Sequence, residues 1–470
     1  MFKKLHETVI ANLLFPLSQN VYNRRGIISE YRRYLSAEHS SRGTLKAVQN
    51  EQICRVLSHA SRWVPYYGKL LGKFKKSADT IDQLPHLLPP LSREAVIEHK
   101  YDLLDNRYLG SISEADRFAR GPGEPLPFSG FKSYPLVRNT SSGSTGTPVV
   151  FYEDGVVSAT SWANELRVKR WFGIEPGSRE SRLVRVTPEY VLKSRVNTWR
   201  KRLWNQQVLP GVNLTQREYK IIAEQWNLFN PRAVWGFSSA VVGLARYILE
   251  NPKELQCRPQ LIITWAAPLY IHEKAIVEEA FKTSVTNIYG MREVGHIGAF
   301  CPEGSLHLFG ESHYLETDEN GELLVTYLKP SPMPFIRYRT GDLGEAVYEK
   351  CPCGRNLLVI KNFVGRTGEI FYTKEGNMIS PNFWCRTFMN ADLALKVKRF
   401  QVVYTKDKDL RLKMILDPQF RADTETVLTK LIHKNFGNTT KLFFDYVDTI
   451  SPQLSGKYQM VVNESVQQST

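Results

Sequence analysis

A short loop rich in hydroxyl side chains is the first segment of this 470-residue chain that could perform chemistry. Residues 139–148 read Asn-Thr-Ser-Ser-Gly-Ser-Thr-Gly-Thr-Pro, and the glycines at 143 and 146 allow a tight turn close to an anion. Successive backbone N–H groups in such a loop can surround phosphate oxygens, and the Ser and Thr hydroxyls add donors. No Gly-Lys-Ser/Thr sequence closes the loop, so it is not a Walker A motif, and an ordinary surface loop stays an equal alternative.

Four further segments that could bind a nucleotide follow in the chain. They are Ile288–Gly295 (Ile-Tyr-Gly-Met-Arg-Glu-Val-Gly), Ile336–Asp342 (Ile-Arg-Tyr-Arg-Thr-Gly-Asp), Val364–Glu369 (Val-Gly-Arg-Thr-Gly-Glu) and Ser451–Lys457 (Ser-Pro-Gln-Leu-Ser-Gly-Lys). Taken singly, each has a plain explanation as a strand end, a turn or a flexible tail. Their order and spacing together are what carry information.

This order of segments resembles that of the adenylate-forming superfamily, which includes acyl-CoA synthetases, adenylation domains and luciferases. The hydroxyl-rich loop, the Ile336–Asp342 run and the Cys-Pro-Cys-Gly-Arg segment at 351–355 are most similar to the phenylacetate–CoA ligase branch. The resemblance covers about residues 130 to 460. A long helical N-terminus like the one expected here is similar to that of branch members in capsule or exopolysaccharide biosynthesis.

The resemblance implies a set of residues that bind ATP. The loop would hold the β- and γ-phosphates, the 266–268 turn and the Tyr-Gly pair would enclose the adenine, and Asp342 would accept hydrogen bonds from both ribose hydroxyls. Arg366 would help to hold the ribose and phosphate. The expected nucleotide-binding residues are Ser142, Gly143, Ser144, Thr145, Gly146, Thr147, Ala266, Ala267, Pro268, Tyr289, Gly290, Asp342 and Arg366.

Two residues are expected to be catalytic. A carboxylate that attacks the α-phosphate of ATP is already ionised at neutral pH, so positioning and charge neutralisation suffice and no general base is needed. By resemblance, Lys457 would bridge the α-phosphate and the acyl oxygen, and Glu293 would support Mg²⁺. The plain alternatives are a solvated tail charge for Lys457 and a turn residue for Asp342.

A second group of residues has the chemistry of a metal site. Cys301, His307, Cys351 and Cys353 follow a Cys-x₅-His and Cys-x-Cys pattern, which supplies four ligands for a closed tetrahedral Zn²⁺ site. The spacing is not that of a standard zinc finger, and ordinary buried thiols beside a surface histidine are an equal alternative. Some ligases of this branch are similar here and carry a structural zinc, so no catalytic role is expected for the cluster.

Composition restricts the partners. The net charge is +15, yet no basic run alternates with aromatic residues as a single-strand nucleic-acid reader requires, and no helix-turn-helix or zinc-finger spacing occurs. We therefore expect an anionic nucleotide substrate and no nucleic acid, with a membrane surface as the second choice. The partners implied are ATP, a small carboxylic acid, and coenzyme A or an amine or hydroxyl acceptor.

The location expected is the cytoplasm, with association to a membrane surface as the finer expectation. No apolar run reaches about 18 residues, which excludes a membrane-spanning helix. Residues 1–25 contain apolar residues flanked by Lys and Arg, without a small-residue cleavage site, so we expect an interfacial helix or a helix that packs on its own domain. The chain has six cysteines, which do not suggest a dense disulfide framework.

The elements that must position these residues indicate an α/β fold with a large N-terminal domain and a small C-terminal α+β lid. We expect residues 1–125 to be a helical part of the large domain, residues 126–367 its AMP-binding core, and residues 368–470 the lid that carries Lys457. Strands are predicted at Ala233–Phe237 and Leu261–Trp265, and a helix capped by Ser238 between them. In the lid, a hairpin at 396–416, a helix at 424–436 and a strand at 441–447 are predicted.

Two departures from the family affect the hinge. Gly368 stands where the family usually has a charged or polar residue, and only Glu369 matches its acidic residue just after the hinge. Glycine permits a hinge there, so the departure concerns domain rotation and not adenylation. Three functions remain in competition: acyl transfer to coenzyme A, transfer to an amine or hydroxyl acceptor in capsule biosynthesis, and a non-catalytic nucleotide-binding scaffold. The presence of Lys457, Glu293 and Asp342 argues against the scaffold.

Overall fold

The structure is a computed structural model of the chain. It describes residues 8–10, 13, 26–77, 79–112, 136–141, 149–186, 204–212, 214–269, 271–366, 371–374, 378–379, 383–384, 387, 397–416, 418–450 and 461–464. None of the helices in these ranges is both long and apolar enough to cross a bilayer.

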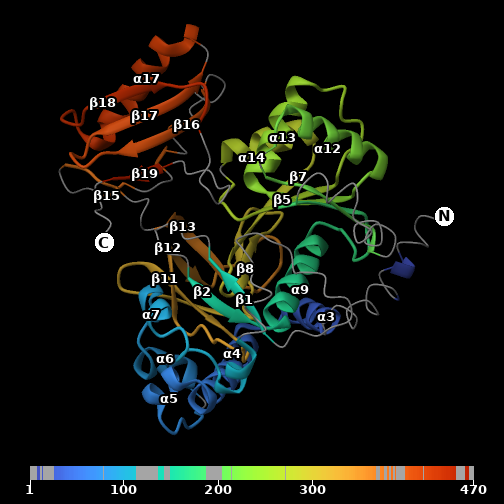
Figure 1. Ribbon diagram of the computed structural model, residues 1–470, viewed down its shortest axis with the longest axis vertical. Coiled ribbons are helices and arrows are strands. Elements are labelled where there is room, and N and C mark those ends of the chain that lie inside the picture. Colours follow the sequence, from blue (N-terminus) through green and yellow to red (C-terminus); the bar gives the residue numbers. More distant parts are fainter. Residues whose placement is uncertain are drawn as a thin grey trace.

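Residues 26–112 are mainly helical and are drawn in blue and cyan in Figure 1; we call them the helical lobe. Its elements are α3 (Ile27–Ala37), α4 (Arg42–Trp63), α5 (Pro65–Leu71), α6 (Thr80–Leu87), α7 (Arg93–Glu98) and the 3₁₀ helix η2 (Asn106–Ser111). Ser41 starts α4 as an N-cap, since its hydroxyl accepts from the Thr44 amide, and Pro65 occupies the first turn of α5. The described residues of this part of the chain are therefore mainly helical, while the predicted domain bounds 1–125 stay a prediction.

An 11-stranded mixed sheet forms the centre of the molecule. In spatial order its strands are β10 (His313–Thr317), β11 (Glu322–Tyr327), β12 (Tyr338–Val347), β13 (Val359–Arg366), β9 (Leu306–Leu308), β8 (Gly295–Phe300), β7 (Ser284–Met291), β6 (Leu261–Trp265), β5 (Ala233–Phe237), β3 (Glu180–Val184) and β4 (Gln206–Pro210). The five strands from β7 to β4 are parallel, and the neighbours from β7 to β10 pair antiparallel. A separate hairpin of β1 (Val137–Thr140) and β2 (Val150–Glu153) flanks the hydroxyl-rich loop.

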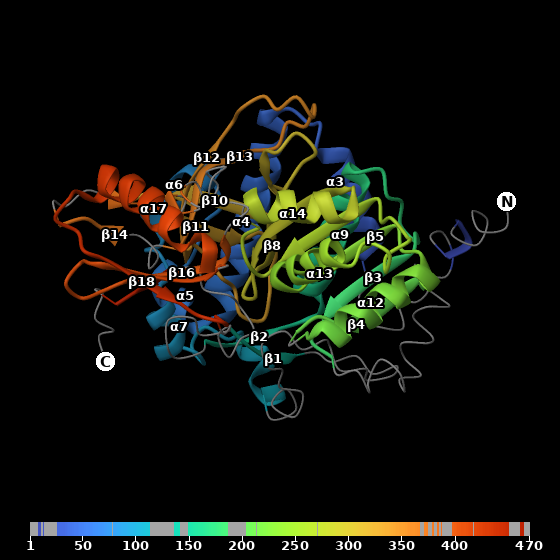
Figure 2. The same cartoon turned by 90° about the horizontal axis from the view of Figure 1, so that it is seen from above.

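Helices cover both faces of the parallel part, as the α/β class requires. On one face lie α12 (Gln216–Phe229), α13 (Ser238–Glu250) and α14 (Ile271–Phe281), seen side by side in Figure 2, and their apolar side chains share one cluster with the strands. On the other face, α9 (Gly155–Trp171) packs between the sheet and α3, and almost its whole circumference is buried. Because α9 is enclosed, its charged residues must pair internally: Arg167, fully buried, binds Glu311 at 2.9 Å.

A small C-terminal unit has its own sheet and its own core. Its main elements are β16 (Val397–Tyr404), β17 (Leu410–Leu416), α17 (Arg421–Phe436), β18 (Leu442–Tyr446) and β19 (Val461–Asn463), with the short strands β14 (Phe371–Tyr372) and β15 (Met378–Ile379) before them. The four longer strands pair in the order β18, β17, β16, β19, and their apolar side chains pack in one cluster with those of α17. The predicted hairpin, helix and last strand are confirmed, although the helix begins at Arg421 and not at residue 424.

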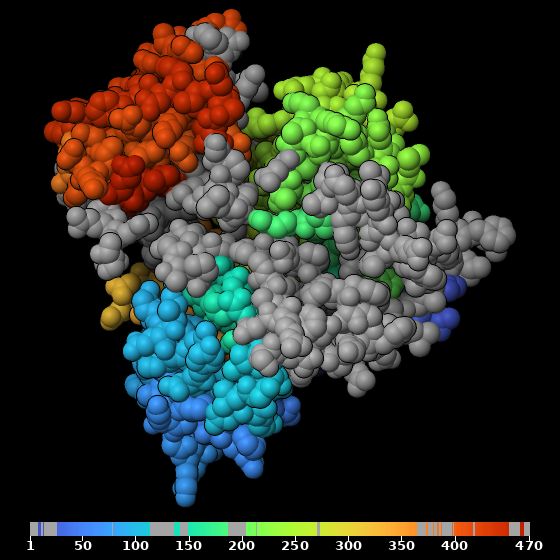
Figure 3. All heavy atoms as spheres, viewed as in Figure 1, coloured from blue at the N-terminus to red at the C-terminus, as the bar shows by residue number. Residues whose placement is uncertain are grey.

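The fold class is thus the predicted one, a large α/β unit with a small α+β unit, shown in space-filling form in Figure 3. The predicted boundary near residue 368 stays a prediction, because residues 367–370 lie outside the described ranges. One local prediction was wrong: Ser238 is the first residue of α13 and not its N-cap, which is Phe237. The Ser238 hydroxyl instead donates to the carbonyl of Ala267, 2.9 Å away.

Candidate active site

The base of the hydroxyl-rich loop is closed by hydrogen bonds between its two ends. The Ser141 amide donates to the Val149 carbonyl at 2.9 Å, and the Val149 amide donates to the Ser141 hydroxyl at 3.0 Å. This clasp continues the β1–β2 hairpin, in which Thr140 pairs with Val150. The predicted phosphate-binding residues from 142 to 147 lie outside the described residues, so their placement stays a prediction.

The loop base is also tied to the second motif. The Arg292 guanidinium donates to Oδ1 of Asn139, and Nδ2 of Asn139 donates to Glu153 at 3.0 Å. Asn139 is almost fully buried, and both the oxygen and the nitrogen of its side-chain amide are hydrogen-bonded in this network. Neither Arg292 nor Asn139 was predicted as a site residue, although both lie inside the segments that carry the resemblance. The structure thus joins two motifs that are 153 residues apart.

The third motif meets the second at Asp342. The Tyr289 hydroxyl donates to Oδ2 of Asp342 at 2.8 Å, and the ring of Tyr289 packs edge-on against Phe363 with centroids 4.6 Å apart. Across the β12–β13 ladder, Asp342 lies opposite Arg366, the last residue of β13. Three of the predicted nucleotide-binding positions therefore lie together at one edge of the sheet. The side chain of Arg366 is outside the described part of the structure.

Glu293 is a buried carboxylate beside the same edge. It is 6 % exposed, and the Tyr338 hydroxyl lies 3.5 Å from its Oε1. A buried carboxylate is costly unless a cation or several donors compensate its charge. One weak donor among the described residues is little compensation, so this carboxylate suits the expected support of a Mg²⁺ ion.

The turn at 266–268 has an unusual backbone. Ala266 adopts φ +70°, in the left-handed region that residues with a Cβ rarely enter. The turn is fixed at Ala267, whose carbonyl accepts from the Ser238 hydroxyl at 2.9 Å and from the Asn287 side-chain amide at 3.1 Å. Because Thr264 pairs with Asn287, the turn lies at the end of β6 next to the strand that carries Tyr289. The predicted adenine-binding residues are thus brought to neighbouring strand ends.

Gly290 is required by close packing of the backbone. A Cβ placed there would lie 2.5 Å from the carbonyl oxygen of Gly295. The two strands β7 and β8 approach closely here, where their register shifts at a bulge between residues 289 and 290. Any side chain would force the two strands apart. The Tyr-Gly pair is therefore a structural requirement of this edge as well as a predicted adenine contact.

Aromatic side chains of β5, β6 and β8 pack against one another. Trp235 is 4 % exposed, with its ring centroid 5.5 Å from that of His296 and 6.1 Å from that of Trp265. Phe237 stacks on Trp265 at 4.7 Å. Nδ1 of His296 lies 3.1 Å from the Ser161 carbonyl, and burial lowers the pKa of His296 to about 4, so the ring is neutral at physiological pH. These side chains thus form an aromatic cluster, and the buried guanidinium of Arg182 lies over one of its rings, 5.0 Å from the centroid of Trp235.

The predicted metal ligands come together. The ligand atoms of Cys301, His307, Cys351 and Cys353 all lie within 4.8 Å of one another. The two sulfurs of Cys301 and Cys351 are 3.7 Å apart, and Sγ of Cys353 is 3.2 Å from Nε2 of His307. Two thiolates bound about 2.3 Å from one tetrahedral zinc lie roughly 3.8 Å apart, so the donor set fits Zn²⁺ in type, number and spacing.

The cluster is connected to the N-terminal helices. Glu38, which follows α3, accepts from the indole of Trp171 at 2.6 Å and from Arg355 at 3.3 Å. The backbone amide of Asn356 donates to the Glu38 carbonyl at 2.9 Å. The segment that follows the Cys-x-Cys pair is therefore fixed to α3 and α9, which suits a cluster that holds the fold and takes no part in catalysis.

Several predicted positions are outside the described residues. These are the phosphate loop from Ser142 to Thr147, the hinge residues Gly368 and Glu369, and Lys457. Among described residues, the structure brings together Tyr289, Gly290, Glu293 and Asp342, with the 266–268 turn on the adjacent strand end. The metal ligands form a separate group.

Comparison with known proteins agrees with this geometry. The CapK C-terminal domain family matches residues 371–464. The chain is 24 % identical to protein CapK of Staphylococcus aureus over 71 % of its length and 75 % of that protein. It is 26 % identical to phenylacetate-coenzyme A ligase of Thermus thermophilus over 72 % of its length and 74 % of that protein.

Among solved structures, the chain is similar to 2-hydroxyisobutyryl-CoA ligase in the postadenylation state in complex with 2-HIB-AMP. The TM-score is 0.65 at 17 % identity, and the match covers 88 % of this chain and 89 % of the other. At this identity the likeness shows the fold, which is that of a large and a small domain in adenylate-forming enzymes.

Proposed function

The chain is classed with the adenylate-forming superfamily, on the branch of phenylacetate–CoA ligase and CapK, and from this premise we propose that it activates a carboxylic acid with ATP and transfers the acyl group to coenzyme A. Enzymes of this class are AMP-forming ligases. The observation that best supports the proposal is the contact between Tyr289 and Asp342, which joins two motifs 53 residues apart at one edge of the sheet.

In the proposed first step, a substrate carboxylate oxygen attacks the α-phosphorus of ATP, and the bond from that phosphorus to the pyrophosphate oxygen breaks. The products are an acyl-adenylate and pyrophosphate. Asp342, with one oxygen held by Tyr289, would orient the ribose by accepting from its hydroxyls. The loop that begins after the Ser141–Val149 clasp would receive the β- and γ-phosphates on its backbone N–H groups.

Charge on the phosphates requires compensation as the bond breaks. Glu293 would hold Mg²⁺, which when bound neutralises phosphate charge. Lys457 would donate to the α-phosphate and acyl oxygens from the small unit. Arg292 contributes indirectly, because its bond to Asn139 fixes the start of the loop relative to the Tyr-Gly strand. No general base is needed, because the attacking carboxylate is already ionised at neutral pH.

In the proposed second step, a thiolate of coenzyme A attacks the acyl carbon and AMP leaves. The small unit would rotate about the segment near Gly368 between the two steps, because it would present a different face to the active site in each of them. A membrane association through residues 1–25 is a further proposal, for which the support is the apolar residues with Lys and Arg at the flanks.

A second candidate acceptor is an amine or hydroxyl in capsule or exopolysaccharide biosynthesis. The observation that favours it is the match of the C-terminal unit to the CapK C-terminal domain family. The small unit supplies the surface that faces the acceptor in the second step, so this is the part of the chain where a different acceptor would be selected. The adenylation step is the same for both candidates.

Zn²⁺ is proposed as a structural ion bound by Cys301, His307, Cys351 and Cys353. When bound, it would supply a cross-link between the strand end after β8, strand β9 and the segment before β13. No step of the reaction depends on it.

ATP–pyrophosphate exchange over a panel of carboxylic acids tests the proposed function. At least one acid is expected to stimulate exchange, with AMP as the nucleotide product. Isolation of the acyl-adenylate, followed by addition of coenzyme A or of an amine, then separates the two acceptors. Release of ADP and phosphate with the cognate acid would contradict the proposal.

A further inference from the structure

The end of the helical lobe carries an excess of positive charge that the proposed reaction does not use. Between Glu51 and Asp79 the sequence contains no Asp or Glu, yet it contains Arg55, Arg62, Lys69, Lys73, Lys75 and Lys76. Arg55 is paired with Glu51 on α4. The other five basic residues belong to the end of α4, to α5 and to the segment that follows it.

A second segment lies against α5 and extends this surface. The Tyr66 amide donates to the Asp102 carbonyl at 2.9 Å, and Nζ of Lys69 is 3.7 Å from the Asp102 carboxylate. The guanidinium of Arg107 lies over the ring of Trp63, 4.6 Å from its centroid. Residues 62–76 and 100–107 therefore form one continuous surface, which we call the lobe-tip surface.

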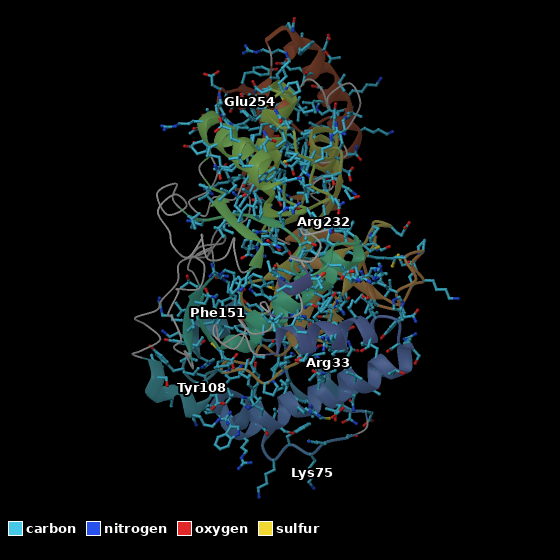
Figure 4. All side chains as sticks on the ribbon, turned by 90° about the vertical axis from the view of Figure 1, so that its right-hand side faces the viewer. Arg33, Lys75, Tyr108, Phe151, Arg232 and Glu254 are labelled. Atoms are coloured by element: carbon cyan, nitrogen blue, oxygen red, sulfur yellow. The ribbon has the colours of Figure 1, made fainter. Side chains whose placement is uncertain are left out.

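The lobe-tip surface is exposed and carries apolar side chains among its cations. Leu70 is 46 % and Tyr101 53 % exposed, and the side chain of Lys69 is 74 % exposed. Lys73, Lys75 and Lys76 are exposed as well. Figure 4 shows Lys75 at the lower extremity of the molecule, beyond the helices of the lobe. Nζ of Lys100 lies over the ring of Tyr101, 4.3 Å from its centroid, so exposed apolar and basic groups adjoin on this surface.

Acidic groups do not balance this charge. Asp105 is fully buried and is bound by Arg107. Asp102 is half-exposed and lies beside Lys69, and Glu98 is the exposed acid nearest to it in sequence. Lys73, Lys75 and Lys76 are exposed, and no ion pair joins them to another residue in the described part of the chain.

We propose that the lobe-tip surface binds the protein to an anionic lipid bilayer. Each Lys or Arg near an anionic membrane surface contributes attraction, and a Leu and a Tyr at the interface add apolar contact and hydrogen bonding at the headgroups. Trp63 already carries the guanidinium groups of Arg62 and Arg107, so its ring is engaged within the protein.

The position of the surface is compatible with catalysis at a membrane. In Figure 1, the end of the lobe with α5 and α6 lies away from the C-terminal unit with β16 and α17. Docking through the lobe tip would leave the small unit clear of the bilayer and able to move. The protein would therefore be held at a membrane without hindrance to the rotation that the proposed function requires.

Vesicle flotation with the full-length chain tests the inference. Wild-type protein is expected to float with vesicles of phosphatidylcholine and phosphatidylglycerol, not with phosphatidylcholine alone, and to be released by high salt. The triple variant Lys73→Glu, Lys75→Glu, Lys76→Glu is expected to bind about 100-fold more weakly, because each basic residue at an anionic surface contributes roughly a factor of five in affinity. Leu70→Ser with Tyr101→Ser, both exposed, is expected to weaken binding about tenfold.

The matched control places the same charge change elsewhere. Lys406, Lys430 and Lys434 are on the C-terminal unit, and all three are exposed. The triple variant Lys406→Glu, Lys430→Glu, Lys434→Glu should bind anionic vesicles like wild type. Circular dichroism and melting temperature of every variant should match wild type, which shows that the fold is retained.

Four outcomes would overturn the inference. The first is absence of wild-type binding to anionic vesicles, and the second is an equal loss in both triple variants, which would mean that net charge alone drives binding. The third is full binding by the lobe-tip triple variant, which would assign the membrane contact to another segment such as residues 1–25. The fourth is that the protein binds a soluble polyanion and anionic vesicles do not displace that polyanion from it. None of these outcomes bears on adenylation, which the exchange assay measures independently.

Discussion

The nucleotide edge of the large sheet and the Cys–His cluster lie at opposite ends of one strand and differ in almost every physical property. The nucleotide edge consists of Tyr289, Glu293 and Asp342, and the last residue of β13 pairs with Asp342. The cluster lies at the other end, where Val359, the first residue of β13, pairs with His307. Eight residues of strand separate the two regions by about 23 Å.

Glu293, a carboxylate of the nucleotide edge, makes a single long contact among the described residues. Asp342 is half-buried, with one oxygen held by Tyr289. The cluster instead has its four ligand atoms directed toward each other, in a setting that is largely buried. The difference teaches that a site for chemistry keeps polar atoms available for a ligand, whereas a site for stability satisfies them internally. Substitutions at the first should change activity without stability, and at the second the reverse.

The largest effect is expected for Lys457→Ala. Loss of a positioned cation should slow adenylation by about 100-fold or more, because charge on the α-phosphate would lack its partner. A synthetic acyl-adenylate should still be transferred to its acceptor at a near-normal rate, since the small unit would present another face in that step. Single-turnover assays of both half-reactions provide the measurement. An equal loss in both would mean that Lys457 is structural, and a loss in neither that it is a solvated tail residue.

A smaller effect is expected for Asp342→Ala. Its removal leaves the ribose hydroxyls without a charged acceptor, a loss of roughly 1.5 to 3 kcal/mol, which weakens ATP binding tenfold or more. Calorimetric titration with ATP measures the affinity. The matched control is Tyr289→Phe, which removes only the hydroxyl that orients Asp342 and should weaken binding by a smaller factor. Unchanged ATP affinity in the Asp342 variant would argue against its proposed role.

The cluster is expected to act on stability. The double substitution Cys351→Ser and Cys353→Ser should abolish zinc binding, which elemental analysis should find at about one ion per chain in the wild type. The melting temperature should fall by several degrees, while ATP affinity of the folded variant stays near wild type. A wild-type preparation without metal but fully folded would remove the zinc proposal. Loss of nucleotide binding in the folded variant would show that the two ends of β13 are not independent.

The smallest effect concerns His313, a fully buried histidine of β10 that belongs to neither region. Nε2 donates to the Val294 carbonyl at 2.9 Å, and burial lowers the pKa of this histidine to about 4. In the unfolded chain the pKa is near 6.5, so as pH falls below about 6.5 the unfolded state takes up the proton first and stability decreases.

We expect the free energy of unfolding to drop by about 1 to 2 kcal/mol per such histidine between pH 7 and pH 5. The substitution His313→Asn should reduce the difference in melting temperature between pH 7 and pH 5, even if it lowers both values. Calorimetric scans at the two pH values provide the measurement. An unchanged pH dependence would mean that other groups account for the acid sensitivity.

Several features could be predicted because they depend on local sequence. Alternation of apolar runs and helical segments predicts the strands at 233–237 and 261–265, and the structure confirms both. The C-terminal hairpin and helix follow from turn residues and from Gly437 after α17. The cluster ligands follow from residue type, since three cysteines and a histidine supply the four ligands of a tetrahedral zinc site, although the sequence left buried thiols as an equal alternative.

Other features depend on strand register between distant segments and could not be read from the sequence. The capping prediction for Ser238 was wrong because the helix begins at Ser238 itself, whose hydroxyl donates to the Ala267 carbonyl at the end of the neighbouring strand. The Arg292 to Asn139 bond requires the β1–β2 hairpin to lie against the end of β7. The left-handed backbone of Ala266 could not be predicted from the sequence, because its methyl side chain gives no sign of that conformation.

The sequence by itself determined which chemical groups are present and in what order, together with the α/β class that would hold them. The tertiary structure decided which groups meet. Tyr289 reaches Asp342 only because four antiparallel pairings from β7 to β12 set the register of both strands, and the Cys–His cluster closes only because β9 lies between β8 and β13. A one-residue slip in any of these pairings would turn the side chains to the opposite face, so the contacts of both regions are properties of the assembled sheet.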